Sequence, residues 1–114
     1  LNKKYFFDLD AIKILGANGR MKNPGDVWAI NTQPLNGSHT ATFPEQLVEQ
    51  IVLCGSPKGG VVFDPFLGTG TTWIVSNRLG RSCIGFEINQ EFFDFAQSRF
   101  KESRKFEQCQ LPIS

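Results

Sequence analysis

A glycine-rich segment at residues 64–72 has the side chains of this 114-residue sequence that are best suited to hold a charged ligand. Gly68 and Gly70 permit a tight turn and let a ligand lie against bare backbone. Threonines fill three positions beside these glycines, and their hydroxyl and N–H groups suit a carboxylate or phosphate at a helix start. Asp64 can attract a positive group. The segment therefore indicates a ligand with one anionic and one cationic end.

Glu87 follows a second apolar run, which predicts the next strand along the chain. In dinucleotide-binding folds an acidic residue about 20 residues after the glycine loop grips the ribose hydroxyls, and the same geometry serves any adenosine. Ile88 is then placed to flank an adenine ring. S-adenosylmethionine fits this pattern, because its amino-acid moiety is zwitterionic and its sulfonium adds a further positive charge.

Two nucleotide-binding alternatives are disfavoured by residue type. A phosphate-binding loop of the GxxxxGK[ST] kind needs a lysine, and none follows Gly70. The dinucleotide pattern GxGxxG needs a third glycine where this sequence has Trp73. A GxG loop alone has low specificity, so a turn with a purely structural role stays open. An acidic residue at a strand end, such as Glu87, also stays open as a solvated side chain.

The elements that must position these residues alternate between helices and strands. Apolar residues at helical spacing after Pro44 predict a helix, and continuous apolar runs predict strands that are buried on both faces. Asn89 is a suitable N-cap for the last helix. The order helix, strand, helix, strand, helix implies parallel strands. These elements are expected at residues 44–54, 61–63, 73–79, 82–86 and about 90–105.

The first thirty residues contain fewer patterned positions. Residues 5–9 predict either a short strand or an extended arm, and residues 16–25 predict a loop because of their glycine, asparagine and proline content. Branched and aromatic residues predict a short strand at residues 26–30. We therefore expect an N-terminal arm at residues 1–25 and a cofactor-binding half-domain at residues 26–114.

Composition narrows the class of protein. The net charge of +1 shows no excess of basic residues, which a protein that binds nucleic acid alone would normally have. DNA therefore stays open only as the substrate of a larger assembly. Three dispersed cysteines and a single histidine offer neither a zinc spacing nor a disulfide framework, which favours a reducing, cytoplasmic setting. No apolar run reaches the roughly 20 residues of a membrane span. We expect neither a metal nor a membrane as a partner.

Eleven phenylalanines are many for so short a chain. The core is the usual place for each of them. A group near the C-terminus has a second interpretation, in which it faces another chain or a missing segment. The members of this group are Phe92, Phe93, Phe95, Phe100 and Phe106.

Residues 64–72 closely resemble the cofactor loop of bacterial DNA amino-methyltransferases of the adenine-N6 or cytosine-N4 type. Residues 85–88 look like the acidic strand-end motif of these enzymes. Residues 38–47 resemble the segment that precedes the cofactor loop and closes over the methionine end, and residues 23–28 are similar to a stretch after the recognition region. The resemblance spans roughly residues 20–100, in the order of the permuted beta group, whose cofactor motifs come last.

The resemblance implies a Rossmann-like α/β fold, a three-layer methyltransferase sheet that is incomplete in this chain, and an S-adenosylmethionine site. His39 has an alternative as a solvated loop histidine, and Phe66 has one as a core residue instead of part of the methyl-transfer pocket. The candidate cofactor-binding residues are His39, Thr40, Ala41, Thr42, Phe43, Asp64, Pro65, Phe66, Gly68, Thr69, Gly70, Thr71, Thr72, Glu87 and Ile88.

The motif that holds the target base is absent. In the resembling enzymes an Asp/Ser/Asn-Pro-Pro-aromatic motif holds the exocyclic amino group of an extruded base. The sequence has six prolines, none adjacent to another, so no catalytic residue is assigned. The resemblance therefore implies part of a split or fragmented methyltransferase for double-stranded DNA, with the Pro-Pro motif upstream or on a complementary chain. Adenine and cytosine both stay open as the target. The alternative is a non-catalytic half-domain that binds a nucleotide or cofactor.

Overall fold

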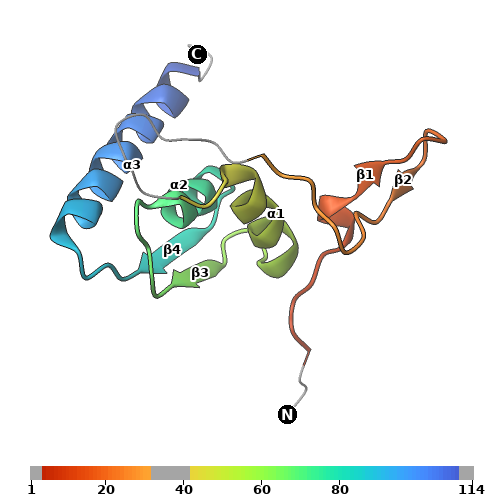
Figure 1. The fold of residues 1–114 in the computed structure, drawn as a ribbon, viewed down its shortest axis with the longest axis horizontal. Helices are drawn as coiled ribbons and strands as arrows, with labels where there is room; N and C mark the ends of the chain where they lie inside the picture. Colours follow the sequence, from red (N-terminus) through yellow and green to blue (C-terminus); the bar gives the residue numbers. More distant parts are fainter. Residues whose placement is uncertain (1–3, 32–41, 111–114) are drawn as a thin grey trace.

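The computed structural model describes residues 4–31 and 42–110, and these form a mixed α/β fold (Figure 1). The arrangement confirms the α/β class and its predicted order of helices and strands. The elements are η1 (Asp10–Ile12), β1 (Ile14–Leu15), β2 (Met21–Lys22), α1 (Glu45–Gly55), β3 (Val61–Asp64), α2 (Thr71–Arg78), β4 (Ser82–Gly85) and α3 (Gln90–Gln110).

Strands β3 and β4 pair in parallel, and α2 is the connection between them. Phe63 lies opposite Ile84 in the register of the two strands. The pairing continues past the end of β3, where the N–H of Phe86 donates to the carbonyl oxygen of Asp64 at 3.0 Å. This is the βαβ unit that alternating helical and apolar segments predict.

One face of this two-stranded sheet is covered by helices. Val48 and Val52 of α1 and Val75 of α2 form a buried cluster, and Val62 of β3 packs against it together with Leu79. Helix α2 also contacts α3, so α2 lies between the other two helices (Figure 1). Burying a valine side chain stabilises a fold by roughly 1.5–3 kcal/mol, so this cluster fixes α1 and α2 against β3.

The opposite face of the sheet is bare within the described part of the chain. Val61, Phe63, Ile84 and Phe86 alternate onto it, each with between 53% and 62% of its surface exposed. The rings of Phe63 and Phe86 meet edge to face, with centroids 6.0 Å apart. The expectation of strands buried on both faces is therefore wrong for residues 4–31 and 42–110, because no second layer lies against this face.

Helix α3 begins as the sequence predicts and ends later. The side-chain oxygen Oδ1 of Asn89 accepts hydrogen bonds from the N–H groups of Glu91 at 2.9 Å and Phe92 at 3.2 Å, which confirms the N-cap. The helix continues to Gln110, beyond the expected end near residue 105, because no glycine or proline interrupts it. None of the described helices, α3 included, is both long enough and apolar enough to cross a membrane.

The C-terminal phenylalanines divide between two environments. The ring of Phe100 stacks on Trp73 of α2 with centroids 4.0 Å apart, so this contact fastens α3 to α2. Phe92, Phe93 and Phe95 are half-buried. Phe106 is 67% exposed, near the end of α3. Phe100 is half-buried in this contact, so none of the five reaches the fully buried core, and Phe106 remains available for a contact outside the described residues.

The N-terminal segment departs from the prediction of a loop at residues 16–25. Strands β1 and β2 form a short antiparallel hairpin, in which the N–H of Gly16 donates to the carbonyl oxygen of Arg20 at 2.8 Å (Figure 1). The loop expectation is wrong at Met21–Lys22, which form β2. Strands of two residues are too short for any alternation of apolar and polar side chains to reveal them.

Two further N-terminal expectations have different outcomes. Residues 26–30 do not form a strand, so that prediction is wrong; they pair with neither of the two sheets in the described part of the chain. Branched and aromatic residues favour strands only where an edge is present for pairing. Residues 5–8 form an arm without helix or strand, Leu9 already has helical dihedrals as the N-cap of η1, and the N–H of Asp8 donates to the carbonyl oxygen of Cys54 at 2.8 Å.

Gly70 marks a close approach between the glycine loop and α3. Its φ is +83°, and a Cβ atom added there would lie 2.8 Å from the Cβ of Ala96. We expect Gly70→Ala to lower the free energy of unfolding by about 2–5 kcal/mol, because left-handed strain adds to overpacking. Urea denaturation measures this loss.

Gly59→Ala is the matched control for this experiment. Gly59 has a similar φ of +76°, but a Cβ atom there would meet nothing within 4 Å. Its loss should be about 1–2 kcal/mol, from strain alone. Equal losses in the two variants would contradict the close packing of the loop on α3.

Candidate cofactor site

The segment between β3 and α2 folds back on itself through its own polar groups. The Oδ1 atom of Asp64 accepts a hydrogen bond from the N–H of Phe66 at 3.0 Å. The N–H of Gly70 donates to the carbonyl oxygen of Leu67 at 3.0 Å. These two bonds turn the chain from the end of β3 into the start of α2.

Within the described residues, the first turn of α2 has backbone N–H donors without a protein acceptor. The first hydrogen bond of this helix joins the N–H of Ile74 to the carbonyl oxygen of Gly70 at 3.0 Å. The N–H groups of Thr71, Thr72 and Trp73 precede it, so they lie in the turn where a helix has no internal acceptors. A helix start of this kind favours a negatively charged group.

A pocket of about 130 Å³ lies against this turn. Ligand sites of drug-sized molecules usually measure about 300–1,000 Å³, so this volume suits one end of such a ligand. Threonine hydroxyls and three phenylalanine rings make it both polar and aromatic. Its lining consists of Thr42, Phe43, Phe66, Leu67, Gly68, Thr69, Thr71, Thr72 and Phe92.

Glu87 lies beside the loop at the end of β4. Its Oε2 atom accepts a hydrogen bond from the N–H of Gly68 at 2.8 Å, and its Oε1 atom accepts one from the N–H of Asn89 at 2.8 Å. Both bonds fix the carboxylate, and each oxygen keeps a lone pair for a further hydroxyl donor. The side chain of Ile88, which follows it, is fully exposed.

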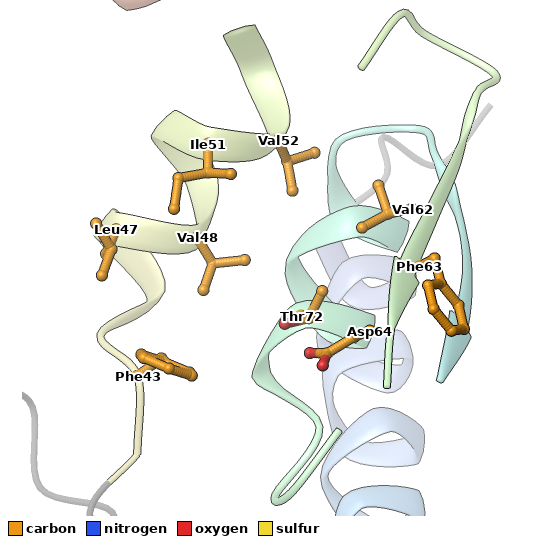
Figure 2. Close-up of a pocket in the computed structure, with 9 residues that line it drawn as sticks. All are labelled: Phe43, Leu47, Val48, Ile51, Val52, Val62, Phe63, Asp64 and Thr72. Atoms are coloured by element: carbon orange, nitrogen blue, oxygen red, sulfur yellow. The ribbon is translucent and has the colours of Figure 1, made fainter. Parts of the chain in front are cut away.

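A second pocket adjoins the first one on the side of α1 (Figure 2). It has a volume of about 220 Å³ and is mostly apolar, with Leu47, Ile51 and Val62 among its lining residues. Figure 2 shows Asp64 and Thr72 side by side at its loop end, with Phe43 on the α1 side. Phe43 and Thr72 line both pockets, so a ligand in the first pocket has an apolar neighbour.

The structure places the predicted site residues in several groups. Asp64 lines the adjoining pocket, Glu87 bonds to the loop, Gly70 is buried against α3, and Pro65 and Ile88 are exposed. His39, Thr40 and Ala41 lie outside the described residues. For every candidate site residue, described or not, contact with a ligand remains a prediction. The predicted residues that line the first pocket are Thr42, Phe43, Phe66, Gly68, Thr69, Thr71 and Thr72.

Three residues of the site were not predicted from the sequence. Leu67 and Phe92 line the first pocket, and Arg99 bonds to the loop at the carbonyl oxygen of Thr69. Phe92 had a usable signal, since it lies in the first turn of the helix that follows Glu87. Arg99 had none, because it meets the loop only after α3 packs across it.

Arg99 joins three elements around the loop. Its Nη1 atom donates to the carbonyl oxygen of Thr69 at 2.7 Å and lies 3.3 Å from the hydroxyl oxygens of both Thr69 and Thr71. Its Nη2 atom is 3.7 Å from Oε1 of Glu45. The other carboxylate oxygen of Glu45, Oε2, accepts a hydrogen bond from Arg78 at 2.8 Å. Burial lowers the pKa of the Arg99 guanidinium from its ordinary value, and the Glu45 carboxylate opposes this shift.

Cys83 lies on β4, on the helix-covered side of the sheet near Trp73 and Phe93. Burial raises the pKa of its thiol from 9.0 to about 11, and the negative charge of Asp64 adds to the shift. Because the thiolate is the reactive form, this cysteine is unsuited to nucleophilic chemistry at neutral pH. In the part of the chain that the structure describes, no group of acidic, histidine or cysteine side chains is placed to hold a metal ion.

The raised pKa of Cys83 predicts a difference in alkylation between cysteines. At pH 8.5 we expect its thiol to react with iodoacetamide at least about tenfold more slowly than the exposed Cys109 thiol. The unfolded thiol ionises near pH 9.0 and the folded one near pH 11, so the folded state also loses stability as pH rises through this window. Mass spectrometry of labelled peptides measures the rates. Equal rates in the folded protein, as expected only in urea, would contradict the burial of Cys83.

Comparison with known proteins identifies the class. The sequence profile of the N6_N4_Mtase family, described as DNA methylase, matches residues 2–98. The chain belongs to this DNA methylase family. The type II methyltransferase M.SmaI of Serratia marcescens is 44% identical over 104 residues, which cover 90% of this chain and 36% of that relative. The chain therefore spans about a third of the length of the curated relatives it matches.

Two solved structures resemble this fold. The complex of M1.HpyAVI with SAM has 25% sequence identity and a TM-score of 0.58, over 84% of this chain and 43% of that one. The cytosine-N4-specific PvuII DNA methyltransferase has a TM-score of 0.69 at 23% identity, over 88% of this chain and 40% of that one. The likeness to PvuII methyltransferase is one of fold alone. Both likenesses identify the chain as part of a Rossmann-like methyltransferase fold.

Proposed function

We propose that this chain forms the S-adenosylmethionine-binding part of a DNA methyltransferase that methylates the exocyclic amino group of adenine or cytosine. The observation that supports this most directly is the threonine-lined pocket at the start of α2, beside the carboxylate that Glu87 fixes against Gly68. The family match supports a DNA methylase, and the M1.HpyAVI structure contains the same cofactor. Restriction-modification is the setting that a type II methyltransferase relative suggests.

The residues present fit the methionine end of this cofactor. A carboxylate in the first pocket would meet the free N–H groups of α2 and the threonine hydroxyls. Gly68 leaves its side of the backbone open, since a Cβ atom there would meet only the carbonyl oxygen of Phe66, at 3.9 Å. The exposed Phe43 and Phe66 rings offer faces to a cationic group, which they attract through their π-electrons.

The adenosine end fits at Glu87, beside the loop. The Glu87 carboxylate is held by two backbone N–H groups, so it is already oriented to accept ribose hydroxyls. The exposed Ile88 side chain lies directly after it and offers an apolar surface to adenine. When bound, S-adenosylmethionine supplies an electrophilic methyl group on its sulfonium. The residues of this chain bind and orient that donor, and they leave the target base to other residues.

The target base is assigned to a Pro-Pro motif outside these 114 residues, on a preceding segment or a complementary chain. Two observations support this proposal: no two prolines are adjacent here, and one face of the β3–β4 sheet is bare in the described part. Parallel sheets are normally covered on both faces. The motif order suggests the permuted beta group. Double-stranded DNA is then the substrate of the complete enzyme.

The proposed division of the chain is an arm at residues 1–25 and a cofactor-binding half-domain at residues 26–114. The hairpin of β1 and β2 extends away from the βαβ unit, which supports this division (Figure 1). Ile12 is buried, and η1 packs on α1, so the arm has an anchor on the half-domain. All three cysteines are free thiols, which supports a reducing, cytoplasmic setting.

A second candidate function is a half-domain that binds S-adenosylmethionine or another nucleotide without turnover. The observation in its favour is the same lack of adjacent prolines. The two candidates differ in what accompanies the chain. A partner or segment with an Asp/Ser-Pro-Pro-aromatic motif supports the enzyme, and its sequence would discriminate between them.

Binding measurements test the cofactor proposal. Isothermal titration of the protein should show binding of S-adenosylmethionine and none of NAD or ATP. Glu87→Gln should weaken S-adenosylmethionine binding about tenfold or more, because the amide has no negative charge and one acceptor oxygen in place of two. Glu102→Ala, a change at an exposed acidic residue of α3, is the control and should leave the affinity unchanged. Tighter binding of NAD than of S-adenosylmethionine would refute the assignment.

Reconstitution tests the proposed source of the base-holding motif. The 114-residue chain alone should transfer no tritium-labelled methyl group to double-stranded DNA. Co-expression with the segment or chain that has the Pro-Pro motif should restore transfer, and replacement of the aromatic residue of that motif by alanine should abolish it. Methylation of DNA by the isolated chain would show that the motif is not required.

A further inference from the structure

Arg99 bonds to the glycine loop at Thr69 and Thr71 without itself lining the pocket. Helix α3 crosses the loop at Ala96, which is fully buried against Gly70. One turn later along α3, the Arg99 side chain reaches the loop with only 12% of its surface exposed. A charged side chain is rarely buried to this degree unless it is paired, so its partners are informative.

The partners of Arg99 fix the direction in which two hydroxyl groups donate. A guanidinium has five N–H donors and no acceptor, whereas a threonine hydroxyl has one proton and two lone pairs. The hydroxyl oxygens of Thr69 and Thr71 lie 3.3 Å from Nη1 of Arg99, so both accept from it and share the N–H that the Thr69 carbonyl oxygen does not take. Each hydroxyl proton is then left for an acceptor elsewhere. Both threonines line the first pocket, so a ligand there is in a position to supply that acceptor.

Arg99 also turns a carbonyl group away from the pocket. The carbonyl oxygen of Thr69 accepts its 2.7 Å hydrogen bond, so the negative end of this peptide group faces α3. Glu45, which lies 3.7 Å from Nη2, is shared with Arg78 at the shorter distance of 2.8 Å. The positive charge of Arg99 is therefore only partly balanced where it adjoins the loop.

We propose that Arg99 is a positioning residue that makes the glycine loop select the carboxylate of its ligand. It holds the Thr69 carbonyl away from the pocket and orients the Thr69 and Thr71 hydroxyls as donors toward the ligand. A carboxylate accepts from both hydroxyls, whereas an ammonium or an apolar group does not. This inference rests on the proposed function, since it assigns the carboxylate to the methionine end of S-adenosylmethionine.

The test compares two ligands that differ only in that group: S-adenosylmethionine and its decarboxylated analogue. In the complete protein that contains these residues, Arg99→Lys retains a charge but loses the fork geometry that reaches several acceptors. We expect the Kd of the decarboxylated analogue divided by the Kd of S-adenosylmethionine to fall at least about tenfold in this variant, mainly because S-adenosylmethionine binds more weakly. Arg104→Lys, at an exposed position of α3, should leave the ratio unchanged.

A double-mutant cycle separates positioning from general loss of structure. Thr71→Val removes the hydroxyl at nearly constant volume, and Thr71→Ser retains it. In the Thr71→Val background, Arg99→Lys should lower the ratio by much less than in the native background, whereas in the Thr71→Ser background its full effect should remain. Thermal unfolding of each variant checks that the fold persists.

The outcomes divide between the inference and the function on which it rests. If Arg99→Lys weakens both ligands equally, or leaves both unchanged, the positioning role is overturned and the cofactor assignment stands. An effect of Arg99→Lys that is as large in Thr71→Val as in the native protein also overturns it. If the native protein binds neither ligand, the proposed function itself fails.

Discussion

The glycine loop keeps its shape because α3 approaches its backbone so closely at Gly70 that no side chain fits between them. That approach brings two further α3 residues to the site. Phe92, one turn before Ala96, lines the pocket, and Arg99, one turn after it, donates a hydrogen bond to the carbonyl oxygen of Thr69 in the loop. The second close approach, between Gly85 and Leu67, fixes the loop against the end of β4. The pocket is thus shaped by backbone contacts that only glycine permits.

The features that the sequence predicts correctly depend on neighbours close along the chain. The start of α3 follows from Asn89, whose side chain caps its own helix, and the turn after β3 follows from Asp64 and the glycines. The parallel pairing of β3 with β4 follows from the single helix between them, which leaves little choice of topology. Periodicity and capping are local properties, and a single sequence displays them.

The features that the sequence misses depend on what lies across the fold. Residues 26–30 have the composition of a strand but pair with none of the described strands, and Met21–Lys22 form a strand only through the hairpin with β1. The apolar runs of β3 and β4 predict that both faces of the strands are covered, but they do not show where the covering layer comes from. Arg99 is separated from Thr69 by 30 positions, and only the packing of α3 brings them together.

Because one face of the sheet is bare in the described part, the stability of each copy of this chain in a cell depends on what covers that face. An uncovered copy presents four large apolar side chains beside open strand edges, the features that promote aggregation and attract chaperones and proteases. Surplus copies would then be removed, while covered copies would persist. The amount of working protein would then follow the supply of the covering layer.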